Sequence, residues 1–190
     1  EEKKNVFLGY DLDDPEQFQS FENYLWNQVD EGVSLKEALQ FSPELLEYIY
    51  SVAYSFYQQS NFSKSITLFQ FLILLDPMDY RYQFGIAANM QMSGDFISAV
   101  NHYAIAAKIE DKTPSPAYYA GECYLKIDDI DSAVLAFEEV VKKSGKKKKF
   151  FEIKERSSLI LKNLRSLLEE GSSVSEKKTK KHKSRKKKKR

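Results

Sequence analysis

Histidine and cysteine, two side chains that often carry catalysis or hold metals, are scarce in this 190-residue sequence. Its two histidines, His102 and His182, have no partner at a metal-ligand spacing. The one cysteine, Cys123, excludes an internal disulfide and fits a reducing compartment. Ser144-Gly145-Lys146 lacks the upstream glycine and the downstream Ser or Thr of a phosphate-binding loop. We therefore expect no enzyme, no metal site and no cofactor.

A different set of side chains has the spacing of a binding surface. Tyr50, Tyr54 and Tyr57 stand at positions i, i+4 and i+7, which share one face of a helix. Another face of that helix already carries apolar residues for packing, namely Ile49, Val52, Ala53 and Phe56. Tyrosine offers flat apolar area and a hydroxyl for backbone groups, as interface anchors often do. We expect a peptide-binding groove; the alternatives are that these tyrosines belong to the core or form a solvated aromatic face.

The helices that would position these tyrosines repeat with a period of 34 residues. Large apolar residues recur at Phe69, Tyr103 and Phe137, and small ones at Ala53, Ala87 and Gly121. This period is typical of the tetratricopeptide repeat, in which each unit is a pair of antiparallel helices, A and B. The small residue lets helix B approach helix A, and the large residue fills the space against the next helix. The sequence thus predicts an all-α fold with three units, 46–79, 80–113 and 114–147.

In such stacks, positions 2, 5, 9 and 12 of each helix A point into the concave groove. The first unit supplies Glu47, Tyr50, Tyr54 and Tyr57; the second supplies Arg81, Phe84, Ala88 and Gln91; the third supplies Ser115, Tyr118, Glu122 and Leu125. We expect this set to include the binding residues.

Flanking segments complete the predicted organisation. Residues 1–14 are expected to be a flexible acidic arm, and residues 15–45 to form N-terminal helices. The first of these helices carries Phe18, Phe21, Leu25 and Trp26, which would either cap the first repeat or form a dimer contact. Residues 148–170 have the helical spacing of a helix that closes a repeat stack. Residues 171–190 are a low-complexity basic tail and are expected to be disordered.

Charge is distributed unevenly along the chain. Residues 1–141 contain 8 Lys and Arg against 23 Asp and Glu, whereas residues 142–149 hold six lysines. The longest apolar run has five residues, Phe71–Leu75, too short to cross a membrane. No signal peptide is recognisable at the start of the sequence. We expect a soluble intracellular protein whose acidic body could help to recruit a basic partner.

Three stretches resemble the class II chaperones of type III secretion, the translocator chaperones. They are Leu46–Tyr54, Asp79–Gly85 and Tyr119–Cys123, and the likeness covers roughly residues 32–141. The resemblance implies a bacterial cytoplasmic chaperone that binds an extended apolar segment of a translocator and keeps it soluble before export. It also implies that Tyr50, Tyr54 and Tyr57 belong to the site, and that a homodimer forms through the N-terminal helix.

Two alternatives concern other partners. A general tetratricopeptide scaffold would bind some other peptide, but Tyr50, Tyr54, Gly85, Ser115 and Tyr119 replace the Lys, Arg and Asn of a carboxylate clamp. The basic tail departs from the family pattern, and Lys177–Arg190 could bind nucleic acid or another acidic surface.

Overall fold

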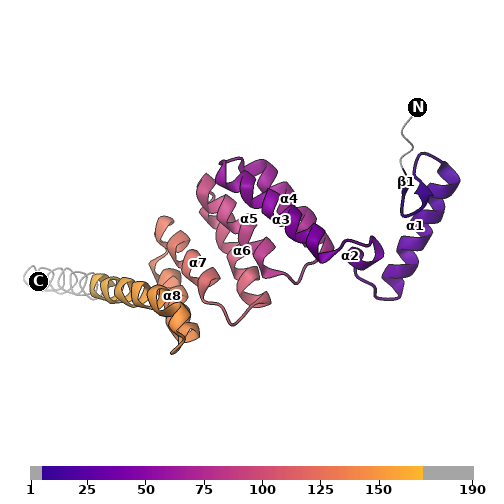
Figure 1. Cartoon of the computed structure of the whole chain (residues 1–190). Coiled ribbons are helices and arrows are strands. Elements are labelled where there is room, and N and C mark those ends of the chain that lie inside the picture. The colour runs from indigo at the N-terminus through magenta and orange to yellow at the C-terminus, as the bar shows by residue number, and fades with distance from the viewer. Residues whose placement is uncertain (1–5, 169–190) are drawn as a thin grey trace, which may run out of the picture. The chain divides into compact units, whose positions relative to one another are not determined.

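The computed structural model of the protein describes residues 6–168. The predicted basic tail, including Lys177–Arg190, lies outside the described residues. The described chain is helical apart from one two-stranded sheet, which confirms the predicted all-α class (Figure 1). It forms two compact units that divide between Asn89 and Met90, inside a helix. From here on, the first unit and the second unit mean these two compact units and not the repeat units of the sequence. Within residues 6–168, we find no helix with the length and apolar character needed to span a bilayer.

The first described residues form a hairpin, where the sequence led us to expect a flexible arm. Strands β1 (Val6–Phe7) and β2 (Tyr10–Asp11) are antiparallel, and both turn residues, Leu8 and Gly9, have positive φ angles of 51° and 87°. The rings of Phe7 and Tyr10 lie 6.0 Å and 5.6 Å from that of Phe21 in helix α1 (Pro15–Asp30). This aromatic contact gives the hairpin an apolar surface on which to pack.

Helix α1 begins as its sequence predicts. The Asp14 carboxylate accepts hydrogen bonds from the backbone N–H groups of Glu16 (2.9 Å) and Gln17 (3.3 Å). The helix contacts β2 and the short helix α2 (Leu35–Ala38), where the Tyr24 hydroxyl donates to the Ala38 carbonyl at 3.0 Å. None of its residues is buried. Of the predicted contact residues, Phe18 and Trp26 are exposed, while Phe21 and Leu25 are half-buried.

The repeat region consists of helical pairs. In the first unit, α3 (Pro43–Gln58) pairs with α4 (Phe62–Leu75). Helix α5 (Tyr80–Ser93) contains the division, so its residues up to Asn89 belong to the first unit. The second unit contains α6 (Phe96–Ile109), α7 (Ser115–Lys126) and α8 (Ile130–Ser144). Figure 1 shows α3 beside α4 and α7 beside α8.

The 34-residue period is visible in the backbone at the turns between helices. Ser60, Gly94 and Asp128 are 34 residues apart and have positive φ angles of 59°, 88° and 58°. Each precedes a short polar residue that starts the next helix. Asp95 and Asp129 accept backbone hydrogen bonds at 3.1 Å from Ser98 and Ser132, respectively. The second and third turns therefore share one capping chemistry, whereas Asn61, after the first turn, makes no side-chain capping bond.

The small and large positions of the period meet in the core. Ala53 and Ala87 are fully buried, as are the rings at the large positions, Phe69, Tyr103 and Phe137. A Cβ atom on Gly121 would lie 2.9 Å from the Phe137 ring. Gly85 was not predicted to be a small packing position, yet a Cβ atom there would lie 2.5 Å from the Phe69 ring. Close approach of an aromatic ring thus requires glycine at both sites.

The second unit ends in a helix described over residues 151–168, which follows the 3₁₀ turn η1 (Lys148–Phe150). Its Leu161 and Leu164 are buried in one cluster with Phe137 and Val140. This packing is what a helix that closes a repeat stack has to provide, because the last pair would otherwise expose apolar side chains.

Candidate peptide-binding site

The three tyrosines of α3, Tyr50, Tyr54 and Tyr57, form what we call the tyrosine face. Tyr54 is 47% exposed, whereas Tyr50 and Tyr57 are half-buried. The Tyr54 and Tyr57 rings stack with centroids 5.9 Å apart and planes at 29°. The Tyr57 ring also lies 6.4 Å from that of Phe62 in α4. The spacing thus brings these rings together as predicted, and α4 supports the end of the face.

Tyr50 joins the tyrosine face to the core of the first unit. Its ring meets Phe69 of α4 edge-on at 5.7 Å and Tyr82 of α5 at 6.2 Å. Burial raises the pKa of the Tyr50 hydroxyl, although the nearby Arg81 opposes this shift. The core alternative weighed for these tyrosines therefore holds in part for Tyr50. Tyr54 remains open to solvent.

A cluster of charges borders Tyr50. The Arg81 guanidinium binds Glu47 at 2.5 Å and Asp79 at 2.5 Å, and these bonds raise its pKa above its ordinary value. Both carboxylates thus neutralise the one basic side chain predicted for this groove. Since its donors are already engaged, Arg81 is poorly placed to grip a peptide carboxylate.

The remaining predicted residues of the first unit lie along α5. Phe84 and Ala88 are half-buried, while Tyr82, Ile86 and Asn89 point into the core and are buried. Arg81, Phe84 and Ala88 have the spacing of one helix face, as predicted. Sequence reasoning missed the two supporting residues Asp79 and Tyr82. The signal that could have identified them is their place in the stretch Asp79–Gly85, which carries part of the family resemblance.

In the second unit, the structure places two predicted groove residues in packed surroundings. Tyr118 is only 7% exposed, and its ring meets that of Phe137 at 5.8 Å. Leu125 packs against the same apolar cluster. Leu161 and Leu164 of the C-terminal helix belong to the same cluster. Position rules that treat every repeat alike do not include that helix.

The polar groups of the predicted groove residues in the second unit form hydrogen bonds within the protein. Burial, and then a hydrogen bond with Glu122, raise the pKa of the Tyr118 hydroxyl, while Arg156 of the C-terminal helix lowers it. Gln91 accepts a hydrogen bond from the Tyr103 hydroxyl at 2.7 Å. Of the predicted residues in this unit, Gln91, Glu122 and Leu125 are half-buried.

The two side chains first considered for chemistry are buried to different degrees. Cys123 is fully buried, and burial raises the pKa of its thiol to about 11. Burial lowers the pKa of the half-buried His102. In the part of the chain that the structure describes, no three His, Cys, Asp or Glu side chains are grouped so as to hold a metal ion.

Comparisons with known proteins identify the same repeat. A family model described as Tetratricopeptide repeat matches residues 46–79. The chaperone protein SicA of Salmonella typhimurium is 30% identical over 116 residues, which cover 61% of this chain and 70% of SicA.

Two crystal structures of the type III secretion chaperone SycD of Yersinia enterocolitica are also similar. One contains SycD with a peptide of the translocator YopD; it is 28% identical, with a TM-score of 0.62 over 65% of this chain and 95% of SycD. The other is an alternative dimer of SycD, 28% identical, with a TM-score of 0.64 over 67% of this chain and 97% of SycD. This chain therefore belongs to the tetratricopeptide-repeat family of type III secretion chaperones, the class II translocator chaperones.

Proposed function

We propose that this protein binds an extended apolar segment of a secreted translocator and keeps that translocator soluble before export. The observation that carries this proposal is the tyrosine face, where Tyr54 is exposed beside two supported rings. The complex of SycD with a YopD peptide supports the proposal, since that relative binds a translocator segment. An apolar segment left in water would aggregate, so masking it has a clear physical purpose.

The chemistry of the face indicates which peptide features it recognises. Stacked tyrosine rings offer apolar area, and their hydroxyls can bond the backbone of an extended chain. The guanidinium of Arg81 is bound by Glu47 and Asp79, so it packs against the Tyr50 ring and is not available to pair with an anion of the client. We expect the client to bind through apolar side chains and its backbone, not through a terminal carboxylate.

The proposed site in the first unit comprises the tyrosine face with Arg81, Phe84 and Ala88. Gln91 and Glu122 of the second unit remain candidate contacts. Tyr118 and Leu125 act, in our proposal, mainly through packing, because they join the apolar cluster.

Co-expression with the organism's candidate translocator tests this function. Tyr50→Ala with Tyr54→Ala is expected to abolish recovery of the translocator on the tagged chaperone. Tyr48→Ala is the matched control, because Tyr48 lies on the same helix, is 66% exposed and is not part of the tyrosine face. Equal recovery by the double variant, with its helical circular dichroism unchanged, would contradict the proposal.

We also propose that the protein is a homodimer in the bacterial cytoplasm. Helix α1 supports this, because Trp26 is 66% exposed and Phe18 is exposed on a helix without a buried residue. The dimeric crystal structure of SycD supports it as well. Trp26→Ser with Phe18→Ser should yield monomers in sedimentation equilibrium. A double variant that remains dimeric would place the interface elsewhere.

A further inference from the structure

A basic segment joins α8 to the C-terminal helix in the second unit. Residues 142–156 contain eight Lys and Arg against two glutamates. We call Lys146–Phe151 the basic loop. The side chains of Lys146–Lys149 are all exposed, and Phe151 is 62% exposed beside them. The basic loop thus presents an exposed aromatic ring close to four exposed lysines.

Local contacts give this loop a defined form. Gly145 ends α8 with a φ angle of 53°, and the Lys154 ammonium donates to its carbonyl at 2.7 Å. The ammonium groups of Lys147 and Lys149 lie 5.6 Å and 4.7 Å from the centroid of the Phe150 ring. Phe150 thus holds two of the lysines by cation–π contacts. Phe151 begins the C-terminal helix and remains open.

Within the described part of the chain, neighbouring carboxylates pair with cations other than those of the loop. Glu139 pairs with Lys143 at 2.8 Å, and Glu138 pairs with Arg165 at 2.6 Å. Among residues 6–168, no carboxylate forms an ion pair with Lys146–Lys149. The loop therefore presents an uncompensated positive surface to an external partner.

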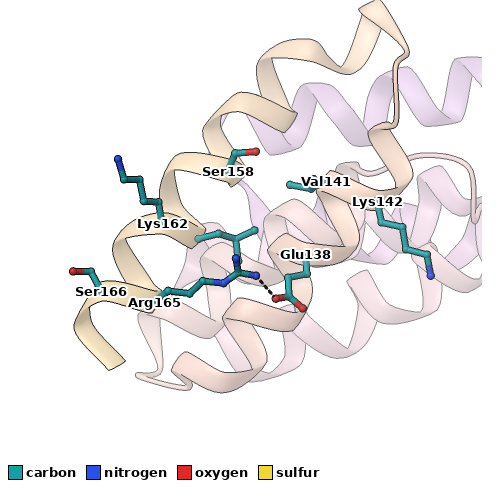
Figure 2. A pocket seen from close by; sticks show the side chains of 8 residues that line it. Glu138, Val141, Lys142, Ser158, Lys162, Arg165 and Ser166 are labelled. Carbon is teal, nitrogen blue, oxygen red and sulfur yellow. Dashed lines mark hydrogen bonds and ion pairs between the residues drawn. The ribbon is translucent and has the colours of Figure 1, made fainter. Parts of the chain in front are cut away.

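A neighbouring depression does not have the form of a pocket for one small anion. It has a volume of about 580 Å³ and lies between α8 and the C-terminal helix. Figure 2 shows that Arg165 points toward Glu138, while Lys142 and Lys162 point away from each other. Because these cations do not converge, the basic end of this unit fits an extended anionic surface better than a single phosphate.

We propose that the basic loop docks this chaperone on a bilayer that contains anionic lipids. Lys146–Lys149 would lie among the headgroups, where each lysine strengthens binding about fivefold. Phe151 would enter the boundary between the headgroups and the acyl chains, as exposed aromatic residues do in interfacial segments.

The composition of the loop favours lipid over nucleic acid. Residues 142–151 contain six lysines and no arginine. Lysine acts as a point charge on a flexible stem, which suits the diffuse field of a charged bilayer. Arginine, with its planar fork, is the usual choice for bases and phosphates in nucleic acids. The proposal does not depend on the client site, because the loop contains no residue of the tyrosine face.

Flotation of the full chain with vesicles tests the proposal, using phosphatidylcholine alone and phosphatidylcholine mixed with phosphatidylglycerol. The chain should bind only the anionic vesicles. Replacing Lys146, Lys147, Lys148 and Lys149 together by Gln should weaken binding at least a hundredfold. The sequence offers a matched control, because Lys186–Lys189 is also a run of four lysines but has no neighbouring aromatic residue. The same four substitutions there should weaken binding less.

Insertion of the aromatic ring has its own readout. Phe151→Trp in a Trp26→Phe background should give a blue-shifted emission spectrum with anionic vesicles, and Phe151→Ser should weaken binding several-fold. An emission spectrum that does not change would overturn the insertion of Phe151. Wild-type vesicle binding by the fourfold lysine variant of the loop would overturn the docking proposal. The same variant should also be titrated with an oligonucleotide, and a loss of oligonucleotide binding without a loss of vesicle binding would overturn the proposal as well. Circular dichroism confirms that each variant is folded.

Discussion

The guanidinium carbon of Arg81 lies 4.9 Å from the centroid of the Tyr50 ring, and the same guanidinium binds Glu47 and Asp79. One residue of α5 therefore links the tyrosine face of α3 to two carboxylates. This contact helps to fix the Tyr50 ring beside the core of the first unit. The Arg81 guanidinium is thereby engaged by both carboxylates.

Replacing Arg81 should loosen this link. In Arg81→Gln, Glu47 and Asp79 lose their shared partner, and we expect a destabilisation of about 1 kcal/mol because the cluster is partly exposed. Arg81→Lys keeps the charge but not the forked geometry, so an intermediate loss is expected. Urea unfolding measures both. Wild-type stability in Arg81→Gln would show that the cluster contributes nothing measurable.

Gly85→Ala should destabilise the first unit, although alanine favours helices. The added Cβ atom would lie 2.5 Å from the buried Phe69 ring. Overpacking of this kind costs about 1–3 kcal/mol. A contact as short as 2.5 Å with a buried ring places the cost toward the upper end of that range, above the gain of about 1 kcal/mol in helix propensity. Thermal unfolding should show the loss. Gly85→Ala with Phe69→Leu should lose less than the sum of the two single variants, and strict additivity would contradict the steric explanation.

Ser65 replaces the alanine found at the matching positions 99 and 133, and it has a structural role. Its hydroxyl donates to the Ala53 carbonyl at 2.8 Å and accepts from the Asn89 amide at 2.9 Å. Ser65→Ala should therefore cost about 1–2 kcal/mol, since Asn89 loses a buried partner. A double-mutant cycle with Asn89→Ala should show coupling of about 1 kcal/mol. Zero coupling in urea unfolding would contradict this role.

Stability should decline at alkaline pH, and two buried groups, Cys123 and Tyr82, should contribute most. Burial raises the pKa of the Cys123 thiol from 9.0 to about 11 and that of the Tyr82 hydroxyl from 10.0 to about 12. Well below pH 9 both groups are protonated in the folded and the unfolded chain, so they do not lower the stability there. Above pH 9 the unfolded chain loses these protons first, which favours unfolding.

The measurement is the urea midpoint at a series of pH values from 8 upward. Cys123→Ala should show a weaker decline between pH 9 and 11, because one of the two groups is absent. An identical decline in the variant and the wild type would exclude a contribution from Cys123.

Features that repeat along the chain were the ones that could be predicted from the sequence. The 34-residue period predicted the helical pairs, and it recurs in the left-handed backbone of the turns at Ser60, Gly94 and Asp128, because each pair needs a similar turn between its helices. The i, i+4, i+7 spacing brought the tyrosines together for a similarly local reason.

Features that depend on a unique contact were missed. The hairpin turn at Leu8-Gly9 lacks the usual Asn-Gly signal, so only its packing on Phe21 identifies it. Tyr118 was assigned to a groove by its repeat position. It is buried in a cluster that also contains Leu161 and Leu164 of the C-terminal helix, and no rule for internal repeats includes that helix.

The most direct test of the proposed function is the affinity of the purified chain for a fluorescent peptide from the apolar segment of its translocator. Anisotropy titrations should compare wild type, Tyr54→Ala and the Tyr48→Ala control. We predict that Tyr54→Ala weakens binding roughly tenfold or more, as expected for an interface anchor, while Tyr48→Ala binds like wild type. Equal affinities for all three proteins would contradict the assignment of the tyrosine face as the client site.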